Sequence, residues 1–541
     1  MNDRAAYLCG AMRWITPIAL FLGVLLFISA TAKDYGVAWD EPPYYHAADL
    51  HLKWIVEVGD NLLRDKLSKS LDDVNIKAAW HWNPYNVPHP PFSRIISAIA
   101  KNLSGDMVDK FTAYRLAPAL FFAVLVTVIY LWLNELFGPS AGLFAASALM
   151  LIPNLFGYAH IAVTDLPLAT MWFLTVYCFY KGLTGWQWSI ALGVVWGLAL
   201  STKFPALLIP VPLIVWAHLF HRDKYANNIL SLVFLAPLVM VATQPYLWHQ
   251  TGLRVLEFLY EGISRGYRAD ANFGVFFLNQ ILLSQQLPWH YPFYIVAVTT
   301  PEPILLLALI GILSAIWLRE QRSILLLLTL SAAFVLILGV LPGAVLHDGV
   351  RQMLSALPFI AALAGVGFFV LTAALVKVAH RSESLQRINN LKAKVTAAFF
   401  VLVCVNPAID LYLEHPFQLS YYNRLVGGIR GAYERGLETT YFMEAITPAF
   451  VQRLNEKLPH SATVNASFAN FMFEFYQNQG ILRRDIRFSS SGTFDFYLVL
   501  NRRSALSPQD RQVTRSSARL VDSVTLAGVP LVALFDLRKT Q

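Results

Sequence analysis

Apolar segments, each about as long as a membrane crossing, recur between residues 14 and 413. A helix spans the hydrocarbon core of a bilayer with roughly 20 residues. Lys203 and Pro205 interrupt one long stretch and divide it into a fifth and a sixth segment. The pattern predicts a polytopic α-helical membrane protein with about 11 transmembrane helices. These are expected near residues 14–33, 112–133, 139–160, 166–182, 187–202, 204–220, 227–246, 302–318, 323–342, 353–376 and 395–413.

A second pattern begins after residue 413, where polar and apolar positions mix as they do in soluble domains. Residues 448–458 have a helical period, and Gly528 lies between two strand-like runs, where it favours a hairpin. The strand-like runs are 463–468, 494–501, 520–525 and 530–537. We therefore expect a transmembrane domain over residues 1–413 and a small α/β domain over residues 414–541.

The composition excludes a soluble protein of this size. Of the 541 residues, 56% are hydrophobic and only 14% are charged, whereas a soluble chain needs far more polar surface to cover its core. The net charge of +8 comes largely from cations in short loops and indicates membrane topology, so no nucleic-acid partner is expected. The 3 cysteines lie in or beside apolar segments without metal-ligand spacing, and we expect them to pack there.

Short basic loops indicate which ends of the segments face the cytoplasm. With a cytoplasmic N-terminus, the odd number of segments places loop 34–111, loop 247–301 and the tail from residue 414 outside the cytoplasm. The cations that then face the cytoplasm are Lys181, Arg222, Lys224, Arg319, Arg322 and those of loop 377–394. We expect a multi-pass protein of the bacterial plasma (inner) membrane, surrounded by membrane lipids.

Loop 34–111 contains two stretches with amphipathic helical character. Apolar residues fall on one face of residues 44–58, and Pro91 precedes a second stretch at residues 92–103, as is typical of a first-turn proline. Aromatic residues and prolines crowd residues 80–91, which predicts a rigid, non-helical connection. We expect the two helices to lie in the membrane interface and to cover the outer end of the bundle.

Carboxylates occur where apolar segments meet this outer face. Asp40 and Glu41 follow the first segment, and a charge so close to the bilayer is costly unless water, a partner or a substrate meets it. Asp165 follows the third segment and is expected at the level of Asp40. A solvated loop also explains the Asp-Glu pair, and a helix cap before Pro167 also explains Asp165.

Cations are expected on the same face. Lys203 separates two apolar segments there, and Arg351 precedes the tenth segment, where the helix dipole disfavours a positive charge. Snorkelling explains Lys203, and an anionic ligand explains both residues. Tyr44, His89 and His347 are further candidates for substrate binding, although a surface hydrogen bond is the alternative for His89.

The convergence of these groups indicates an amphiphilic ligand with an anionic head, such as a lipid-linked phosphosugar. Asp, Glu and His side chains together also suggest a divalent metal ion, but their spacing matches no defined metal motif. No cofactor follows from the sequence with certainty.

Several motifs, in this order, resemble the C-type glycosyltransferases. An Asp-Glu pair opens the first outer loop, a Pro-Pro segment follows, Thr-Asp-Leu-Pro lies at residues 164–167, and a later segment carries Lys203. Residues 351–358 are similar to the family's Arg-Tyr-x-Leu-Pro-x-x-Pro run, and residues 415–423 to its membrane-exit segment. The nearest branch comprises bacterial relatives of the protein O-mannosyltransferases and the lipid A aminoarabinose transferase.

The resemblance implies an inverting transfer of a sugar from a polyprenyl-phosphate donor to an acceptor outside the cytoplasm. It implies that Asp40 is the general base, that Glu41 supports Asp40, and that Asp165 orients donor or acceptor. It further implies that Lys203 and Arg351 stabilise the phosphate leaving group, on which negative charge develops. The acceptor, a protein, lipid A, a glycolipid or an envelope polysaccharide, stays open.

The chain departs from the family pattern at three positions. The aminoarabinose transferase has an acid-Lys pair before its Pro-Pro, where this chain has Pro88 and His89. Gln352 replaces the usual Tyr, and Ser355 stands where a Pro is common. These departures predict a divergent member with altered recognition of the sugar or acceptor.

Two other classes of function compete with an enzyme. A transporter or flippase of a lipid-linked anionic substrate would more often show internal repeats and broken helices at the bilayer midplane, and no repeat is visible here. A membrane scaffold whose tail binds a partner leaves the clustered charged residues unexplained.

Overall fold

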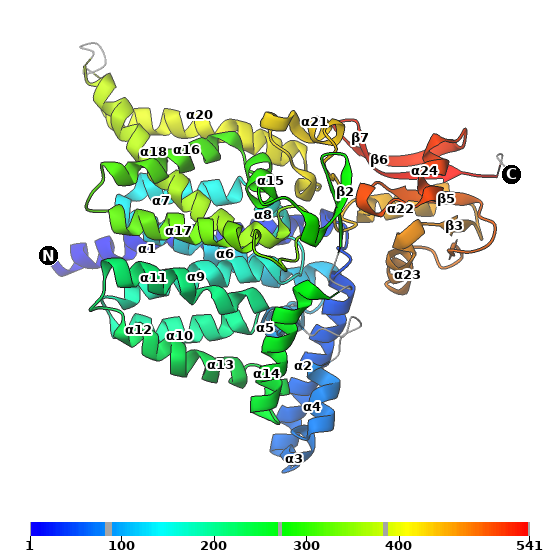
Figure 1. The fold of residues 1–541 in the computed structure, drawn as a ribbon, viewed down its shortest axis with the longest axis horizontal. Helices are drawn as coiled ribbons and strands as arrows, with labels where there is room; N and C mark the ends of the chain where they lie inside the picture. Colours follow the sequence, from blue (N-terminus) through cyan, green and yellow to red (C-terminus); the bar gives the residue numbers. More distant parts are fainter. Residues whose placement is uncertain (1, 82–88, 269–272, 382–387, 539–541) are drawn as a thin grey trace.

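The computed structural model describes residues 2–81, 89–268, 273–381 and 388–538. Apolar helices lie side by side in a bundle, with the N-terminus at one end and the C-terminal domain at the other (Figure 1). The helices of the bundle are α1 (Asn2–Thr31), α6 (Lys110–Phe137), α7 (Pro139–Met150), α8 (Pro153–Tyr158), α9 (Asp165–Gly182), α10 (Trp186–Leu200), α11 (Pro210–Phe220), α12 (Ala226–Leu230), α13 (Ala236–Ala242), α15 (Tyr291–Thr299), α16 (Glu302–Leu313), α17 (Arg322–Leu338), α18 (Leu357–Ala379) and α20 (Leu391–Leu413).

Every predicted apolar segment contains one or more of these helices, which confirms the fold class. Among the described residues, 4 helices are long and apolar enough to cross a membrane, and α15 and α16 form a bent pair with an angle of 120°. The 4 long helices are Trp14–Asp34, Lys110–Phe137, Arg351–Ala379 and Leu391–Leu413. Most of the other predicted spans coincide with shorter apolar helices of 10–17 residues, so the number of crossings stays a prediction.

Local sequence sets the ends of the bundle helices and their closest contacts. The carboxylate of Asp109 caps α6 by accepting hydrogen bonds from two backbone N–H groups at 3.1 Å. Helices α16 and α18 approach so closely that a Cβ on Gly311 would lie 2.0 Å from the carbonyl oxygen of Leu363, and one on Gly367 would lie 1.9 Å from that of Leu307. Only glycine permits this contact.

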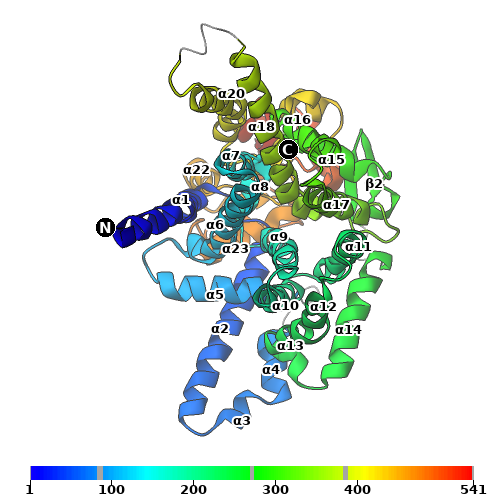
Figure 2. The ribbon, with the colours of Figure 1, turned by 90° about the vertical axis from the view of Figure 1, so that its left-hand side faces the viewer.

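Further helices lie across the end of the bundle that faces the C-terminal domain (Figures 1 and 2). They are α2 (Glu41–Leu63), α3 (Leu67–Ser70), α4 (Asp73–Trp80), α5 (Phe92–Ser104) and α14 (Thr251–Ser264). Both amphipathic helices predicted in loop 34–111 are confirmed as α2 and α5. Helix α2 begins earlier than predicted, because Pro42 and Pro43 occupy its first turn, where their missing N–H groups cost nothing. Most of the predicted non-helical connection, residues 82–88, lies outside the described residues.

The C-terminal domain contains a five-stranded sheet with the order β4-β3-β5-β7-β6. Strand β5 is central and buried along its whole length. Strand β3 pairs in parallel with both β4 and β5. Strand β7 pairs antiparallel with both β5 and β6. The strands are β3 (Thr463–Asn465), β4 (Arg487–Phe488), β5 (Phe496–Leu500), β6 (Arg519–Leu526) and β7 (Val529–Asp536), and the helices are α21 (Gly428–Glu434), α22 (Pro448–Lys457), α23 (Asn470–Asn478) and α24 (Pro508–Arg515). The predicted helix 448–458 and the predicted hairpin at Gly528 are both confirmed.

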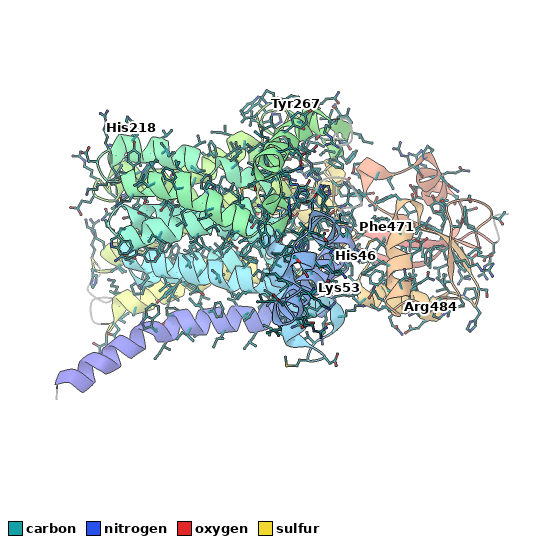
Figure 3. The ribbon with its side chains drawn as sticks, turned by 90° about the horizontal axis from the view of Figure 1, so that it is seen from below. His46, Lys53, His218, Tyr267, Phe471 and Arg484 are labelled. Atoms are coloured by element: carbon teal, nitrogen blue, oxygen red, sulfur yellow. The ribbon has the colours of Figure 1, made fainter. Side chains whose placement is uncertain are left out.

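The sheet domain is docked on the bundle. The hydroxyl of Tyr476 in α23 accepts a hydrogen bond from the backbone N–H of Val37 at 2.9 Å and donates one to the carbonyl of Ile446 at 2.8 Å. Figure 3 shows His46 and Lys53 of α2 close to this domain, whereas His218 lies near the opposite end of the bundle. A hairpin that the sequence did not reveal, β1 (Gly274–Phe277) and β2 (Gln280–Leu283), lies at the same end as the domain.

Candidate active site

Arg351 and Asp40 form the centre of the site, at the end of the bundle that carries the sheet domain. The Arg351 Nη2 atom donates to Asp40 Oδ2 at 2.5 Å. Asp40 is the residue that precedes α2, and its side chain keeps 18% exposure while that of Arg351 has 6%. Among the described residues, the second carboxylate oxygen of Asp40 has no hydrogen-bond donor. This oxygen is therefore free to accept a proton from a ligand.

Asp165 and Lys203 extend the same cluster. Asp165 is the first residue of α9 and does not cap the helix with its side chain; its two oxygens accept from Lys203 Nζ at 2.8 Å and from Arg351 Nε at 3.2 Å. Lys203 Nζ also lies 3.3 Å from the side-chain oxygen of Gln352. The structure thus brings together Asp40, Asp165, Lys203 and Arg351, which the sequence placed on one face.

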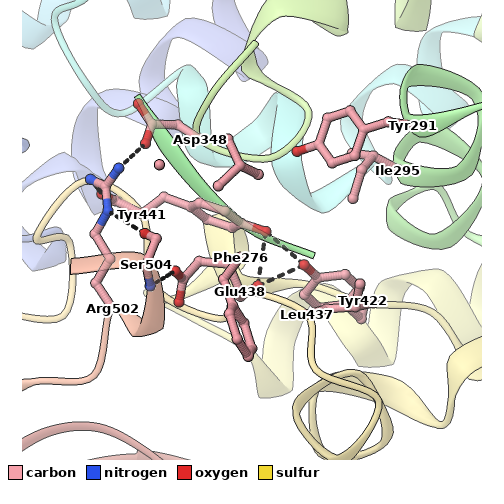
Figure 4. A pocket seen from close by; sticks show the side chains of 12 residues that line it. Phe276, Tyr291, Ile295, Asp348, Tyr422, Leu437, Glu438, Tyr441, Arg502 and Ser504 are labelled. Carbon is pink, nitrogen blue, oxygen red and sulfur yellow. Dashed lines mark hydrogen bonds and ion pairs between the residues drawn. The ribbon is translucent and has the colours of Figure 1, made fainter. Parts of the chain in front are cut away.

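The C-terminal domain supplies a further cation. Arg502, which follows β5, donates to Asp348 Oδ1 at 3.0 Å and to the carbonyl of Tyr441 at 2.6 Å (Figure 4). Asp348 in turn accepts from Arg351 Nη1 at 3.1 Å. The guanidinium of Arg351 also lies 4.6 Å from the ring centre of Phe442. Residues of the sheet domain therefore take part in holding Arg351.

Charges in this cluster balance. Three carboxylates, those of Asp40, Asp165 and Asp348, meet three cations, those of Lys203, Arg351 and Arg502. Buried charges are tolerated when they are paired and hydrogen-bonded in this way.

The surroundings push the pKa values of two carboxylates apart. Burial, together with the nearby Asp348 and Asp165, raises the pKa of Asp40 although Arg351 opposes the shift. Burial also opposes ionisation of Asp165, but Arg351 and Lys203 outweigh it and lower the pKa of Asp165. Such a divided pair is typical of an active site in which one carboxylate moves a proton and the other keeps its charge.

Glu41 is fully buried and pairs with Arg115, which is not one of the six cluster residues. Its carboxylate accepts from the backbone N–H of Ala38 at 2.8 Å and of Ala162 at 2.9 Å, from the Tyr45 hydroxyl at 2.7 Å, and from Arg115 at 2.7 and 2.9 Å. Every donor belongs to the protein, so Glu41 has no oxygen left for a ligand. These contacts suit the supporting role that the sequence analysis assigned to Glu41, and that role stays a prediction.

Three predicted substrate-binding residues lie around the cluster. Tyr44 follows Asp40 by one helical turn and has its ring edge-to-face with His89 at 6.1 Å. His347 stacks on Phe273 at 4.5 Å and lies 3.4 Å from the amide nitrogen of Gln352. Burial lowers the pKa of His89 well below its usual range and that of His347 to about 3. Burial therefore favours the neutral form of both histidines.

Within the described ranges, no group of three or more His, Cys, Asp or Glu side chains could hold a metal ion. The divalent cation that the sequence suggested therefore has no ready ligand set there.

Some residues of the site were not singled out from the sequence. Asp348 could have been found, because it lies three residues before Arg351 in the same short loop and carries the opposite charge. Arg502 could not, because 154 residues separate it from Asp348 and no motif surrounds it. Arg94 of α5, which is 5% exposed, was also missed although it follows the Pro-Pro segment.

Residues 88–249 match the family model for dolichyl-phosphate-mannose-protein mannosyltransferase. The match covers α5 to α13 and includes His89, Asp165 and Lys203. It confirms, over this part of the chain, the resemblance that the sequence motifs indicated. The chain matches none of the curated proteins with which it was compared.

Among solved structures, the fold is similar to the crystal structure of ArnT from Cupriavidus metallidurans in the apo state. The identity is 16% over 97% of this chain and 98% of that chain, with a TM-score of 0.49. The structure of ArnT from Cupriavidus metallidurans bound to undecaprenyl phosphate gives 15% identity over 96% of this chain and 97% of that chain, with a TM-score of 0.46.

Proposed function

We propose that this protein is an inverting membrane glycosyltransferase that moves a sugar from a polyprenyl-phosphate donor to an acceptor outside the cytoplasm. One observation carries the proposal: Arg351 binds one carboxylate oxygen of Asp40, whose pKa is raised, and also binds Asp165, whereas the other Asp40 oxygen has no donor among the described residues. The family match over residues 88–249 and the apolar bundle support the same reading.

Asp40 acts as the general base. The acceptor hydroxyl gives its proton to the free oxygen of Asp40 while its own oxygen attacks the anomeric carbon of the donor sugar. A base of this kind contributes roughly 10²–10⁴-fold to the rate. Because a single displacement forms the new bond opposite the leaving group, the configuration at the anomeric carbon inverts.

Lys203 and Arg351 stabilise the leaving group. The bond between the anomeric carbon and the phosphate oxygen breaks, and the electron pair stays on the polyprenyl phosphate. Lys203 contacts Asp165 and Gln352, which leaves one of its three N–H groups for a phosphate oxygen. Each such contact supplies about 2.7–4 kcal/mol in comparable oxyanion sites. Asp165 stays charged and holds both cations in place.

The site end of the bundle faces away from the cytoplasm under this proposal, and the N-terminus lies in the cytoplasm. The cations at the opposite end of the bundle follow the positive-inside rule, which supports this orientation. Polyprenyl chains fit beside the apolar bundle, whereas the sugar and phosphate reach the charged cluster at its end.

Asp40→Asn tests the proposal. Transfer of labelled sugar from a polyprenyl-phosphate donor to envelope acceptors should fall about 10²–10⁴-fold, while membrane insertion and binding of polyprenyl phosphate persist. Asp60→Asn, on the exposed face of the same helix, is the matched control and should transfer normally. Unchanged transfer by D40N removes Asp40 as the base. A wild type that transfers no sugar but moves the lipid-linked substrate across vesicles would make the protein a flippase.

A further inference from the structure

Arg94 is a buried cation for which the described part of the chain offers no carboxylate partner, and it lines a pocket beside the charged cluster. It is 5% exposed, its Nε atom has no hydrogen-bond partner, and its Nη2 atom donates to the carbonyl of His89. No described carboxylate forms an ion pair with it, and residues 82–88 contain no Asp or Glu. Arg94 thus differs from Lys203 and Arg351, which are both paired.

The pocket offers polar groups that suit an oxyanion. Its walls include the hydroxyl-bearing Ser93 and Ser97 of α5 and Tyr44 of α2, together with Pro118 and Pro167. Ser93 is 6% and Ser97 is 7% exposed. The two serines lie one helical turn apart, so both fall on the same side of α5 as neighbours. An arginine with serine hydroxyls beside it is a donor set that matches phosphate oxygens.

Tyr44 connects this pocket to the charged cluster. It lies one turn after Asp40 on α2, and the guanidinium carbon of Arg94 is 5.9 Å from the centre of its ring. Pro167 of the pocket wall is two residues after Asp165. A ligand in the pocket is therefore adjacent to the groups to which we assign sugar transfer.

A purely structural role does not account for the charge of Arg94. The carbonyl of His89 takes one of its five N–H groups, and an uncompensated buried charge costs several kcal/mol. Burial also lowers the pKa of Arg94 to about 10, as expected for a cation without a partner. No described carboxylate balances the charge of Arg94, so Arg94 is available for an additional negative charge.

We propose that Arg94, with Ser93 and Ser97, forms a second anion subsite that binds a phosphate-type group during the reaction. The inference rests on the proposed function, because it assigns the anion to the same transfer. The anion is either the phosphate of the lipid carrier or an anionic group of the acceptor. The chemistry of recognition is the same for both sources, and a binding experiment separates them.

The experiment measures binding to purified full-length protein in detergent, and it needs no sugar transfer. The unfolding temperature is followed with rising inorganic phosphate, with sodium chloride at equal ionic strength as reference. The same protein is titrated with polyprenyl phosphate and with the corresponding polyprenol, which lacks the phosphate. The variants are Arg94→Gln, Arg94→Lys and, as matched control, Arg64→Gln at an exposed arginine of the same outer loop.

Wild type and R64Q should be stabilised by inorganic phosphate, R94Q should bind it about tenfold more weakly or worse, and R94K should keep part of the affinity. If R94Q binds polyprenyl phosphate more weakly than the wild type does, the anion belongs to the lipid carrier, whether or not the binding of inorganic phosphate is weakened as well. Loss of inorganic phosphate alone assigns it to the acceptor. The proposal is overturned if inorganic phosphate and polyprenyl phosphate stabilise R94Q as much as they stabilise the wild type. It is also overturned if inorganic phosphate stabilises the wild type no more than sodium chloride does and polyprenyl phosphate no more than polyprenol does. If the wild-type protein transfers no sugar, the proposed function is refuted, but the binding measurements still test the anion subsite.

Discussion

At the scale of single residues, Arg351 contacts all three carboxylates of the central cluster. It donates to Asp40, Asp165 and Asp348, and its guanidinium lies over Phe442. The planar guanidinium holds its five N–H donors in fixed directions, so it fixes the three carboxylates relative to one another more strictly than the rotating ammonium of a lysine would. The position of Asp40 and its protonation therefore depend on the same side chain.

The pH profile of sugar transfer tests whether Arg351 controls the protonation of Asp40. Asp40 must be unprotonated to act as a base, so kcat/KM should fall as the pH drops through its raised pKa, above the range of an ordinary aspartate. The positive charge of Arg351 lowers the pKa of Asp40. Arg351→Gln should therefore move the acidic limb upward by about 1 pH unit or more.

Arg351→Lys keeps the charge and is the control; its acidic limb should lie closer to that of the wild type. A limb that stays in place or moves to lower pH in R351Q would mean that Asp40 does not govern the titration.

At the scale of elements, the sequence predicted the type and place of most helices because their apolar residues are dense and continuous. Helix α2 illustrates the limit of that signal: its polar first turn, with Asp40 and Glu41, gives no apolar period, so its start was placed too late. The β1–β2 hairpin was missed for a similar reason, since two strands of four residues carry too little alternation to stand out.

The contact between α16 and α18 supports a prediction at this scale. Gly311→Ala should lower the free energy of unfolding by about 1–3 kcal/mol, because its Cβ would overlap the carbonyl of Leu363 and force the two helices apart. Thermal unfolding in detergent measures the effect. Gly23→Ala in α1 is the control, since nothing lies within 4 Å of its added Cβ. Equal unfolding temperatures for both variants would contradict the close approach of α16 and α18.

At the scale of the whole molecule, the site is built from both ends of the sequence. Asp40 comes from the segment between α1 and α2, Lys203 and Arg351 from the bundle, and Arg502 from the sheet domain. Sequence topology placed the first three on one face because membrane crossings fix the side on which each loop emerges. It could not place Arg502, because nothing in a soluble tail shows where that tail docks.

Arg502 acts as a positioning residue through Asp348. Arg502→Gln should lower kcat about tenfold or more, because a small displacement of Arg351 misplaces Asp40. Arg502→Lys should restore part of the rate, and Arg484→Gln, at an exposed position of the same domain, should behave like wild type. Kinetics of R502Q, D348N and the double variant test the route, since two residues that act through one contact give non-additive losses. Additive losses would show that Arg502 acts elsewhere.

The ion pair between Arg502 and Asp348 also has a consequence for biosynthesis. A chain that is still being made enters the membrane from its N-terminus, so the base and the bundle cations are in place well before residue 502 leaves the ribosome. Under the proposed orientation, Arg351 would obtain its full set of contacts only after the tail has crossed the membrane and folded. Under the proposed function, a chain that ends before residue 502 would therefore lack the contact from Arg502 to Asp348 and should transfer little sugar.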